Sequence, residues 1–189
     1  MPNLPVNIPN VLTVLRILLT PLFIIFLLKQ MYTNALVVFT LAGISDALDG
    51  LIARWFNQRT TLGAYLDPIA DKILLSSAFI SLAILKVIPS WLTVIVISRD
   101  ILILLGIAIF SITDIKVKIK PTLVSKCTTV AQLGTVLYTL FGLDSAAAVF
   151  IGQCIFWITA ALTTLSGLHY MFVGLNILQN NLGTSQNEK

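Results

Sequence analysis

The chain has 189 residues, of which 57% are hydrophobic and 11% charged, and its net charge is +4. With a mean hydropathy of +0.96, this composition excludes an ordinary soluble domain, and the sparse positive charge excludes a nucleic-acid-binding protein. Since about 20 apolar residues cross the hydrocarbon core of a bilayer, the chain has room for six or seven spans joined by short loops.

Six apolar segments are separated by polar or proline-containing breaks, and each is predicted to form a transmembrane helix. They cover residues 11–28, 33–54, 62–85, 91–112, 122–140 and 146–178. The first ten residues contain three prolines and are expected to form an irregular lead-in. They lack a basic stretch and a cleavage site, so the first segment is expected to be an uncleaved span. We predict an all-α integral membrane protein, with a membrane domain over residues 1–178 and a disordered polar tail over 179–189.

The basic residues of the short loops predict the orientation of the helices. Both termini share a side with the loops after the second and fourth segments. The basic residues of these two loops are Arg54, Arg59, Lys116, Lys118 and Lys120. The loops on the opposite side carry only Lys29 and Lys86. Because short loops rich in lysine and arginine stay in the cytoplasm, we predict that both termini are cytoplasmic.

Four of the eight acidic residues lie close together at the junction of the second and third segments. The pattern is Asp46-x2-Asp49-Gly50-x2-Ala53-Arg54-x8-Gly63-x3-Asp67-x3-Asp71. Residues three or four apart share one face of a helix, so we expect two antiparallel helices with facing acidic stripes. Carboxylates at membrane depth repel each other unless cations neutralise them. The pattern therefore predicts a site for Mg²⁺ or Mn²⁺, both of which prefer oxygen ligands.

The other residues of the pattern indicate what the metal would hold. Gly50, Ala53 and Gly63 have almost no side chain and allow a ligand to approach the backbone closely. Arg54, beside a divalent metal, suggests a phosphate or pyrophosphate substrate. A cation or proton path in a non-enzymatic membrane protein is the alternative, and the glycine and arginine positions favour the substrate site.

Charged residues farther along the chain are candidates for a second phosphate contact. Arg99 lies within the fourth segment, Lys120 in the loop that follows it, and Lys126 near the start of the fifth segment. Arginine binds phosphate bidentately and keeps its charge, so Arg99 is the best candidate. Arg99 and Asp100 could instead form a self-neutralising structural pair, and the sequence leaves both readings open.

The acidic pattern resembles, at every fixed position, the signature of the CDP-alcohol phosphatidyltransferases. Two further runs, NIPNVLTVLR at residues 7–16 and LDPIADK at 66–72, resemble one branch of that family. This branch contains the phosphatidylglycerophosphate synthases and the CMP-forming cardiolipin synthases. The resemblance covers the chain except for its terminal tail.

The resemblance implies an activity and gives roles to the pattern. The family consists of six-span membrane enzymes that transfer a phosphatidyl group from a CDP-linked lipid to an alcohol and release CMP. The implied metal ligands are Asp46, Asp49, Asp67 and Asp71, and Asp71 is also the candidate base for the acceptor hydroxyl. The implied contacts to the cytidine nucleotide are Gly50, Ala53, Arg54, Thr60 and Gly63.

The branch also suggests the substrates and the location. The expected donor is CDP-diacylglycerol and the expected acceptor is glycerol 3-phosphate, whose phosphate Arg99, Lys120 and Lys126 would hold. Residues 97–100 and 120–126 look like those of cardiolipin synthases, so phosphatidylglycerol is the alternative acceptor. Chain length and the short N-terminus resemble the bacterial enzymes. The resemblance thus implies a homodimer in the bacterial plasma membrane, with its active site on the cytoplasmic side.

Overall fold

The computed structural model describes residues 8–55, 61–112, 123–142 and 146–186. Within these ranges the side chains of residues 8–12, 46–55, 61–71, 107–112, 146, 178 and 180–186 lie outside the description. The described residues form six α-helices and contain no strand. The helices are α1 (Ile8–Leu28), α2 (Tyr32–Trp55), α3 (Thr61–Ile84), α4 (Ser90–Ile112), α5 (Leu123–Leu140) and α6 (Ala146–Gln186).

These helices confirm the six predicted helical segments, with differences at the two ends of the chain. Helix α1 begins at Ile8, inside the predicted lead-in. Its Pro9 lies in the first turn, where the missing N–H would have no partner within the helix. The prediction of disorder from residue 179 is wrong as far as Gln186, because α6 continues to that residue. Extending an existing helix adds a hydrogen bond for each residue, and no proline interrupts the polar segment.

Two helix ends are closed by the same backbone arrangement. Gln30, after α1, has a φ of 55°, and Lys86, after α3, has a φ of 58°. The next residue in each case donates a hydrogen bond five residues back, from Met31 N to Phe26 O at 2.9 Å and from Val87 N to Leu82 O at 2.9 Å. These bonds define Schellman motifs, in which a left-handed residue ends the helix. Both motifs reverse the chain within a few residues; α2 then packs along α1, whereas α4 makes only a limited contact with α3.

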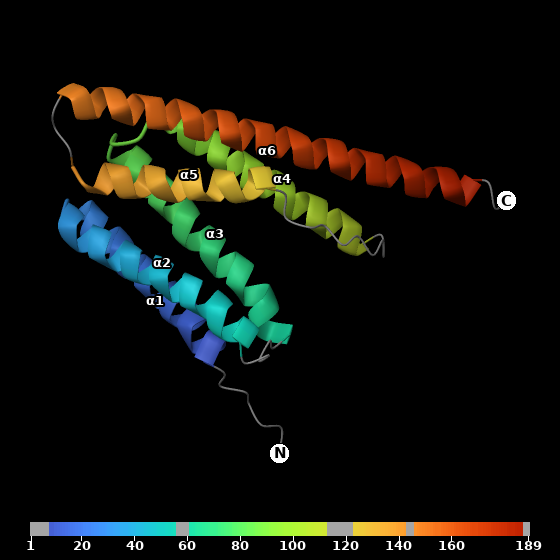
Figure 1. Ribbon diagram of the computed structural model, residues 1–189, viewed down its shortest axis with the longest axis horizontal. Coiled ribbons are helices and arrows are strands. Elements are labelled where there is room, and N and C mark those ends of the chain that lie inside the picture. The colour runs from blue at the N-terminus through green and yellow to red at the C-terminus, as the bar shows by residue number, and fades with distance from the viewer. Residues whose placement is uncertain (1–7, 56–60, 113–122, 143–145, 187–189) are drawn as a thin grey trace, which may run out of the picture.

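The six helices pack as two groups of three (Figure 1). Helix α1 packs against α2 and α3, and α6 packs against α4 and α5. Smaller contacts of α3 with α4, and of α5 with α2 and α3, join the two groups. The buried core runs through both, from Phe23 and Phe39, whose ring centroids are 5.3 Å apart, to Val96 and Val136.

Hydroxyl and amide side chains line the contact between α5 and α6. The Oγ1 atoms of Thr135 and Thr159 are 2.8 Å apart, and Thr128 Oγ1 donates to Leu162 O at 3.1 Å. Gln132 Nε2 donates to Thr163 Oγ1 at 3.4 Å. The residues recur at intervals of three and four on both helices and are buried, so they form one seam. Hydrogen bonds of this kind hold helices together where lipid surrounds them.

Apolar side chains point outward from every helix. One exposed example from each helix in chain order is Leu18, Val37, Ile84, Val94, Val130 and Phe150. Among the described residues, Ala147–Ile177 is one helical stretch that is long and apolar enough to cross a membrane, and three others are apolar but shorter. An apolar exterior around buried polar groups is the arrangement of a helical membrane protein.

Candidate active site

The acidic pattern lies on two helices, as its spacing predicted. Asp46 and Asp49 are in the C-terminal part of α2, and Asp67 and Asp71 are in the N-terminal half of α3. Helix α1 packs against both helices. The residues that join α2 to α3, 56–60, can span at most about 20 Å. The side chains of the four aspartates lie outside the described residues, so the facing of the two acidic stripes stays a prediction.

The side chains of the predicted nucleotide contacts also lie outside the described residues. Gly50, Ala53 and Arg54 lie in α2 and Gly63 in the first turn of α3, with helical backbones. Thr60 lies outside the described residues. Among the side chains that the structure describes, no group of three His, Cys, Asp or Glu could hold a metal ion. The donor chemistry of the pattern itself, carboxylates three and four residues apart on helices, fits a hard divalent cation.

Downstream of this pattern the structure brings charged residues of α3 and α4 together with serines of α5 and α6 in a largely buried cluster. Asp100 Oδ1 on α4 accepts a hydrogen bond from Lys72 Nζ on α3 at 2.5 Å and from Arg99 Nη1 at 2.8 Å. Arg99 Nη2 donates to Ser125 Oγ on α5 at 2.8 Å and to Ser166 Oγ on α6 at 3.1 Å. We call these five residues the Asp100 cluster.

Burial makes these contacts energetically important. The side chains of Arg99 and Asp100 are 4% and 5% exposed, whereas that of Lys72 is 30% exposed. An isolated charge in such surroundings costs several kcal/mol, and pairing with hydrogen bonds offsets that cost. The guanidinium also lies over the ring of Tyr170 on α6, 5.9 Å from its centroid, within the range of a cation–π interaction. These contacts therefore hold the side chains of Arg99 and Asp100 in place within the fold.

The structure describes two of the three predicted phosphate contacts, Arg99 and Lys126. Lys126 is exposed on α5, one residue after the Ser125 that binds Arg99, and Lys120 lies outside the described residues. Both terminal nitrogens of Arg99 already donate hydrogen bonds within the protein. An acceptor phosphate would have to bind the remaining N–H groups of Arg99 or replace one hydroxyl partner.

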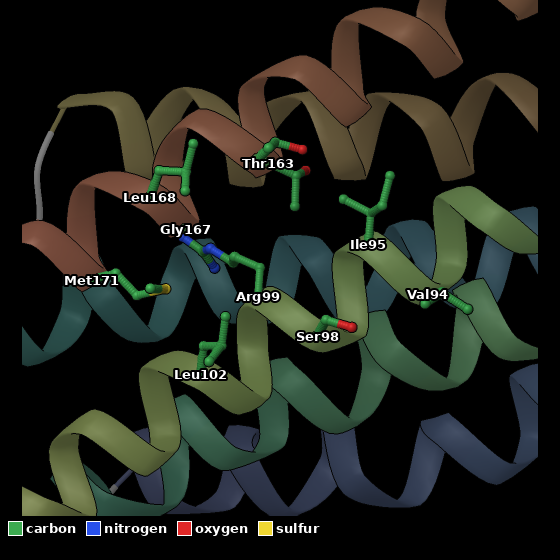
Figure 2. Close-up of a pocket in the computed structure, with 10 residues that line it drawn as sticks. Val94, Ile95, Ser98, Arg99, Leu102, Thr163, Gly167, Leu168 and Met171 are labelled. Atoms are coloured by element: carbon green, nitrogen blue, oxygen red, sulfur yellow. The ribbon is translucent and has the colours of Figure 1, made fainter.

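Arg99 also lies on the wall of an open groove between α4 and α6 (Figure 2). The groove has a volume of about 250 Å³. Its lining residues are Val94, Ile95, Ser98, Arg99, Leu102, Thr163, Thr164, Gly167, Leu168 and Met171. Arg99 is the only charged residue in this lining, and its Nε atom has no hydrogen-bond partner among the residues that the structure describes.

Sequence reasoning did not identify Lys72, Ser125 and Ser166 as parts of a site. For Lys72 the signal available in the sequence was a positive charge within an apolar segment, directly after Asp71. Ser166 continues the series of Thr159 and Thr163 on α6, a spacing that marks one polar face. Their convergence on Asp100 joins positions far apart in the chain, which spacing alone does not reveal.

Comparison with known proteins identifies the family. A family model described as CDP-alcohol phosphatidyltransferase matches residues 6–165. The human protein named cardiolipin synthase (CMP-forming) is 35% identical over 193 aligned positions, which cover 93% of this chain. The Rickettsia felis protein named CDP-diacylglycerol–glycerol-3-phosphate 3-phosphatidyltransferase is 31% identical over 170 positions, covering 87% of this chain and 93% of the relative. The chain belongs to the CDP-alcohol phosphatidyltransferase family.

The relatives differ in how much of their length they share with this chain. The chain spans 64% of the human protein. A Mycobacterium tuberculosis protein named probable phosphatidylglycerophosphate synthase is 36% identical over 116 positions, 58% of this chain and 54% of the relative. Both names of the predicted branch thus occur among the relatives.

Proposed function

We propose that this chain transfers a phosphatidyl group from CDP-diacylglycerol to glycerol 3-phosphate, giving phosphatidylglycerophosphate and CMP. The observation that carries the proposal is the acidic pattern of residues 46–71, complete at every fixed position within a family match over 6–165. The Rickettsia felis relative, which is matched over nearly its whole length, supports this choice of acceptor.

The reaction assigns a task to each part of the pattern. The acceptor hydroxyl oxygen attacks the phosphorus that carries diacylglycerol, the P–O bond to CMP breaks, and the hydroxyl proton passes to Asp71. A divalent ion held by Asp46, Asp49 and Asp67 would neutralise the pyrophosphate and stabilise the departing CMP. Arg54, next to the small residues of α2, supplies a permanent positive charge for the nucleotide phosphates.

Phosphatidylglycerol is the second candidate acceptor. The specific observation in its favour is the match to the human cardiolipin synthase, which covers more of this chain than the Rickettsia felis match. With that acceptor the same transfer gives cardiolipin and CMP. The two reactions share the donor, the leaving group and the roles given to the aspartates, and they differ in the group that Arg99 faces.

The enzyme in this proposal spans the membrane six times, through residues 1–178. The apolar exterior of the described helices supports the spans. The excess of basic residues at the end of α2, where the structure places Arg54, and in the loops after α2 and α4 supports cytoplasmic termini and a cytoplasmic active site. A homodimer in a bacterial plasma membrane is proposed from the family resemblance.

The acceptor is tested by direct competition between substrates. Purified protein is supplied with CDP-diacylglycerol and Mg²⁺, and CMP release is measured with glycerol 3-phosphate, phosphatidylglycerol, inositol phosphate or serine. The expected result is CMP release with glycerol 3-phosphate well above the others. Preference for phosphatidylglycerol would establish the second candidate, and no CMP release with any acceptor would contradict the proposed activity.

A further inference from the structure

The contact between Lys72 and Asp100 joins the two groups of helices. Lys72 belongs to α3, which packs mainly on α1, and Asp100 belongs to α4, which packs mainly on α6. Among the described residues a second hydrogen bond joins the same two helices, from Thr93 Oγ1 to Phe79 O at 3.2 Å. Contacts of α5 with α2 and α3 also join the two groups, and the two hydrogen bonds add polar links between α3 and α4, whose packing is otherwise limited.

Asp100 is the fixed partner in this contact. Arg99 binds its Oδ1 atom and is in turn held by Ser125 on α5 and Ser166 on α6. The carboxylate is therefore anchored to three helices of one group. Lys72 approaches from the other group with a side chain that is 30% exposed. The geometry thus makes α3 the helix that is held, and Asp100 with its partners on α4, α5 and α6 the group that holds it.

Charge balance indicates that the Lys72 contact does more than neutralise Asp100. Arg99 alone compensates the buried carboxylate, and Lys72 brings the cluster to a net charge of plus one. A second cation on one buried carboxylate adds desolvation cost without being needed for neutrality. The atom Oδ2 of Asp100 is buried and has no hydrogen-bond partner among the described residues, so both cations meet on Oδ1.

We propose that Asp100 is a positioning residue: by holding Lys72 it fixes the rotation of the part of α3 that carries Asp67 and Asp71. Consecutive residues of an α-helix are 100° apart around its axis and 1.5 Å apart along it, so α3 cannot turn at Lys72 without turning Asp71 as well. This inference rests on the proposed function, since it concerns the geometry of that reaction.

The test separates kcat from KM in two variants. Lys72→Met removes the contact and leaves the Arg99–Asp100 pair in place, whereas Asp100→Asn removes the charge that holds Lys72. Each is expected to lower kcat by about 10- to 100-fold, because small displacements of reacting groups have effects of this size. The KM values of Lys72→Met for both substrates are expected to stay within about threefold of wild type. Lys72→Arg, which can keep the ion pair, is expected to restore most of kcat.

Thr93→Val is the matched control. It removes the other described hydrogen bond between α3 and α4, seven residues from Asp100 and away from the acidic pattern. We expect it to lower thermal stability and to leave kcat unchanged. The double variant Lys72→Met/Asp100→Asn is expected to have a kcat no lower than the poorer single variant, since both remove one contact.

Three outcomes would overturn the inference: an unchanged kcat in Lys72→Met, an equal loss of kcat in Thr93→Val, or a raised KM for CDP-diacylglycerol at normal kcat. The last would make Lys72 a substrate-binding residue. If Lys72→Met does not give folded protein, the test uses Asp100→Asn. An unchanged kcat in that variant, or a raised KM for CDP-diacylglycerol at normal kcat, would likewise overturn the inference. A wild-type protein that releases no CMP would contradict the proposed function itself, which separates the two failures.

Discussion

Arg99 combines a fixed charge with almost complete burial. Its terminal nitrogens bind Asp100, Ser125 and Ser166, and its stem lies on the wall of the α4–α6 groove. These contacts fit the structural pair that the sequence offered as one reading. They also orient the guanidinium in advance, which would reduce the entropy lost on binding the proposed acceptor phosphate. The two readings therefore predict different kinetics for the same substitution.

Arg99→Ala is expected to raise the KM for glycerol 3-phosphate far more than the KM for CDP-diacylglycerol. Loss of a charge-assisted hydrogen bond costs about 1.5–3 kcal/mol, which corresponds to roughly a 10- to 150-fold change. The measurement is the KM for each substrate in folded protein, with exposed Lys86→Ala as the control for a lost positive charge. An unchanged acceptor KM, together with a low yield of folded protein, would identify Arg99 as a structural residue only.

The aspartates of α3 are expected to differ in their response to metal. Asp67→Asn weakens a proposed metal ligand, so a higher Mg²⁺ concentration should restore part of its activity. Asp71→Asn removes the proposed base and is expected to lower kcat by about 10²-fold or more, with a smaller effect on metal affinity. Activity is measured for both variants across a Mg²⁺ titration. Equal rescue of the two variants would show that Asp71 is a ligand and not the base.

At the scale of the helices, the seam between α5 and α6 explains how two apolar helices recognise each other. Thr135 and Thr159 pair through their hydroxyls at one end of the seam. Lipid is as apolar as leucine, so burial of apolar surface does not favour one helix neighbour over another. The buried hydrogen bonds supply that preference, and they set which faces of α5 and α6 meet.

The pairing of Thr135 with Thr159 is expected to be measurable by a double-mutant cycle. Thr135→Val and Thr159→Val keep the side-chain shape and remove the hydroxyl groups. The coupling energy should be about 0.6 kcal/mol, the average for interhelical hydrogen bonds in a membrane protein. Thermal unfolding in detergent provides the measurement. Thr129→Val is the control, because the Thr129 hydroxyl bonds within its own helix, to Ser125 O. Strictly additive effects would show that this pair of hydroxyls does not contribute to the pairing of α5 with α6.

The helices could be predicted from the sequence because the determinants of each are local. The apolar runs and the polar breaks at Lys29–Gln30 and Pro89 placed most helix ends within a few residues. The left-handed turn residues Gln30 and Lys86 could not be recognised, since neither is the glycine that usually marks such a helix end. The Asp100 cluster was also beyond prediction, because Ser166 is 67 residues from Arg99 and looks locally like any serine of an apolar helix.

On the scale of the whole molecule, the described helices bury polar groups beside an apolar core and also carry many apolar side chains on their exterior. In water this distribution would expose large apolar patches, whereas in a bilayer it satisfies both environments. The acidic pattern adds four carboxylates near the end of this apolar body. In the proposed site a divalent ion would offset the mutual repulsion of these carboxylates.

Chelation is expected to abolish CMP release. Mg²⁺ or Mn²⁺ should restore it, whereas Zn²⁺ should do so poorly, because the pattern offers oxygen ligands and no Cys or His. The assay measures activity after treatment with excess chelator and again after each metal is added back. Full turnover in excess chelator would exclude a metal requirement.

The apolar part of α6 is longer than the hydrocarbon core of a bilayer is thick. Helix α6 is the longest helix, and its C-terminal end extends past the others (Figure 1). Its apolar stretch of 31 residues is about 46 Å long, whereas the hydrocarbon core is about 30 Å thick. Such a mismatch is relieved by tilting the helix, and a thicker bilayer reduces the tilt.

Any change in the tilt of α6 would reach Arg99 through Ser166 and the ring of Tyr170. We therefore expect the KM for the acceptor to differ between protein reconstituted in short-chain and in long-chain lipid. A constant KM would show that the tilt of α6 does not affect the position of Arg99. If the acceptor KM does change with lipid length, the thickness of the bilayer would be one of the variables that set the position of Arg99.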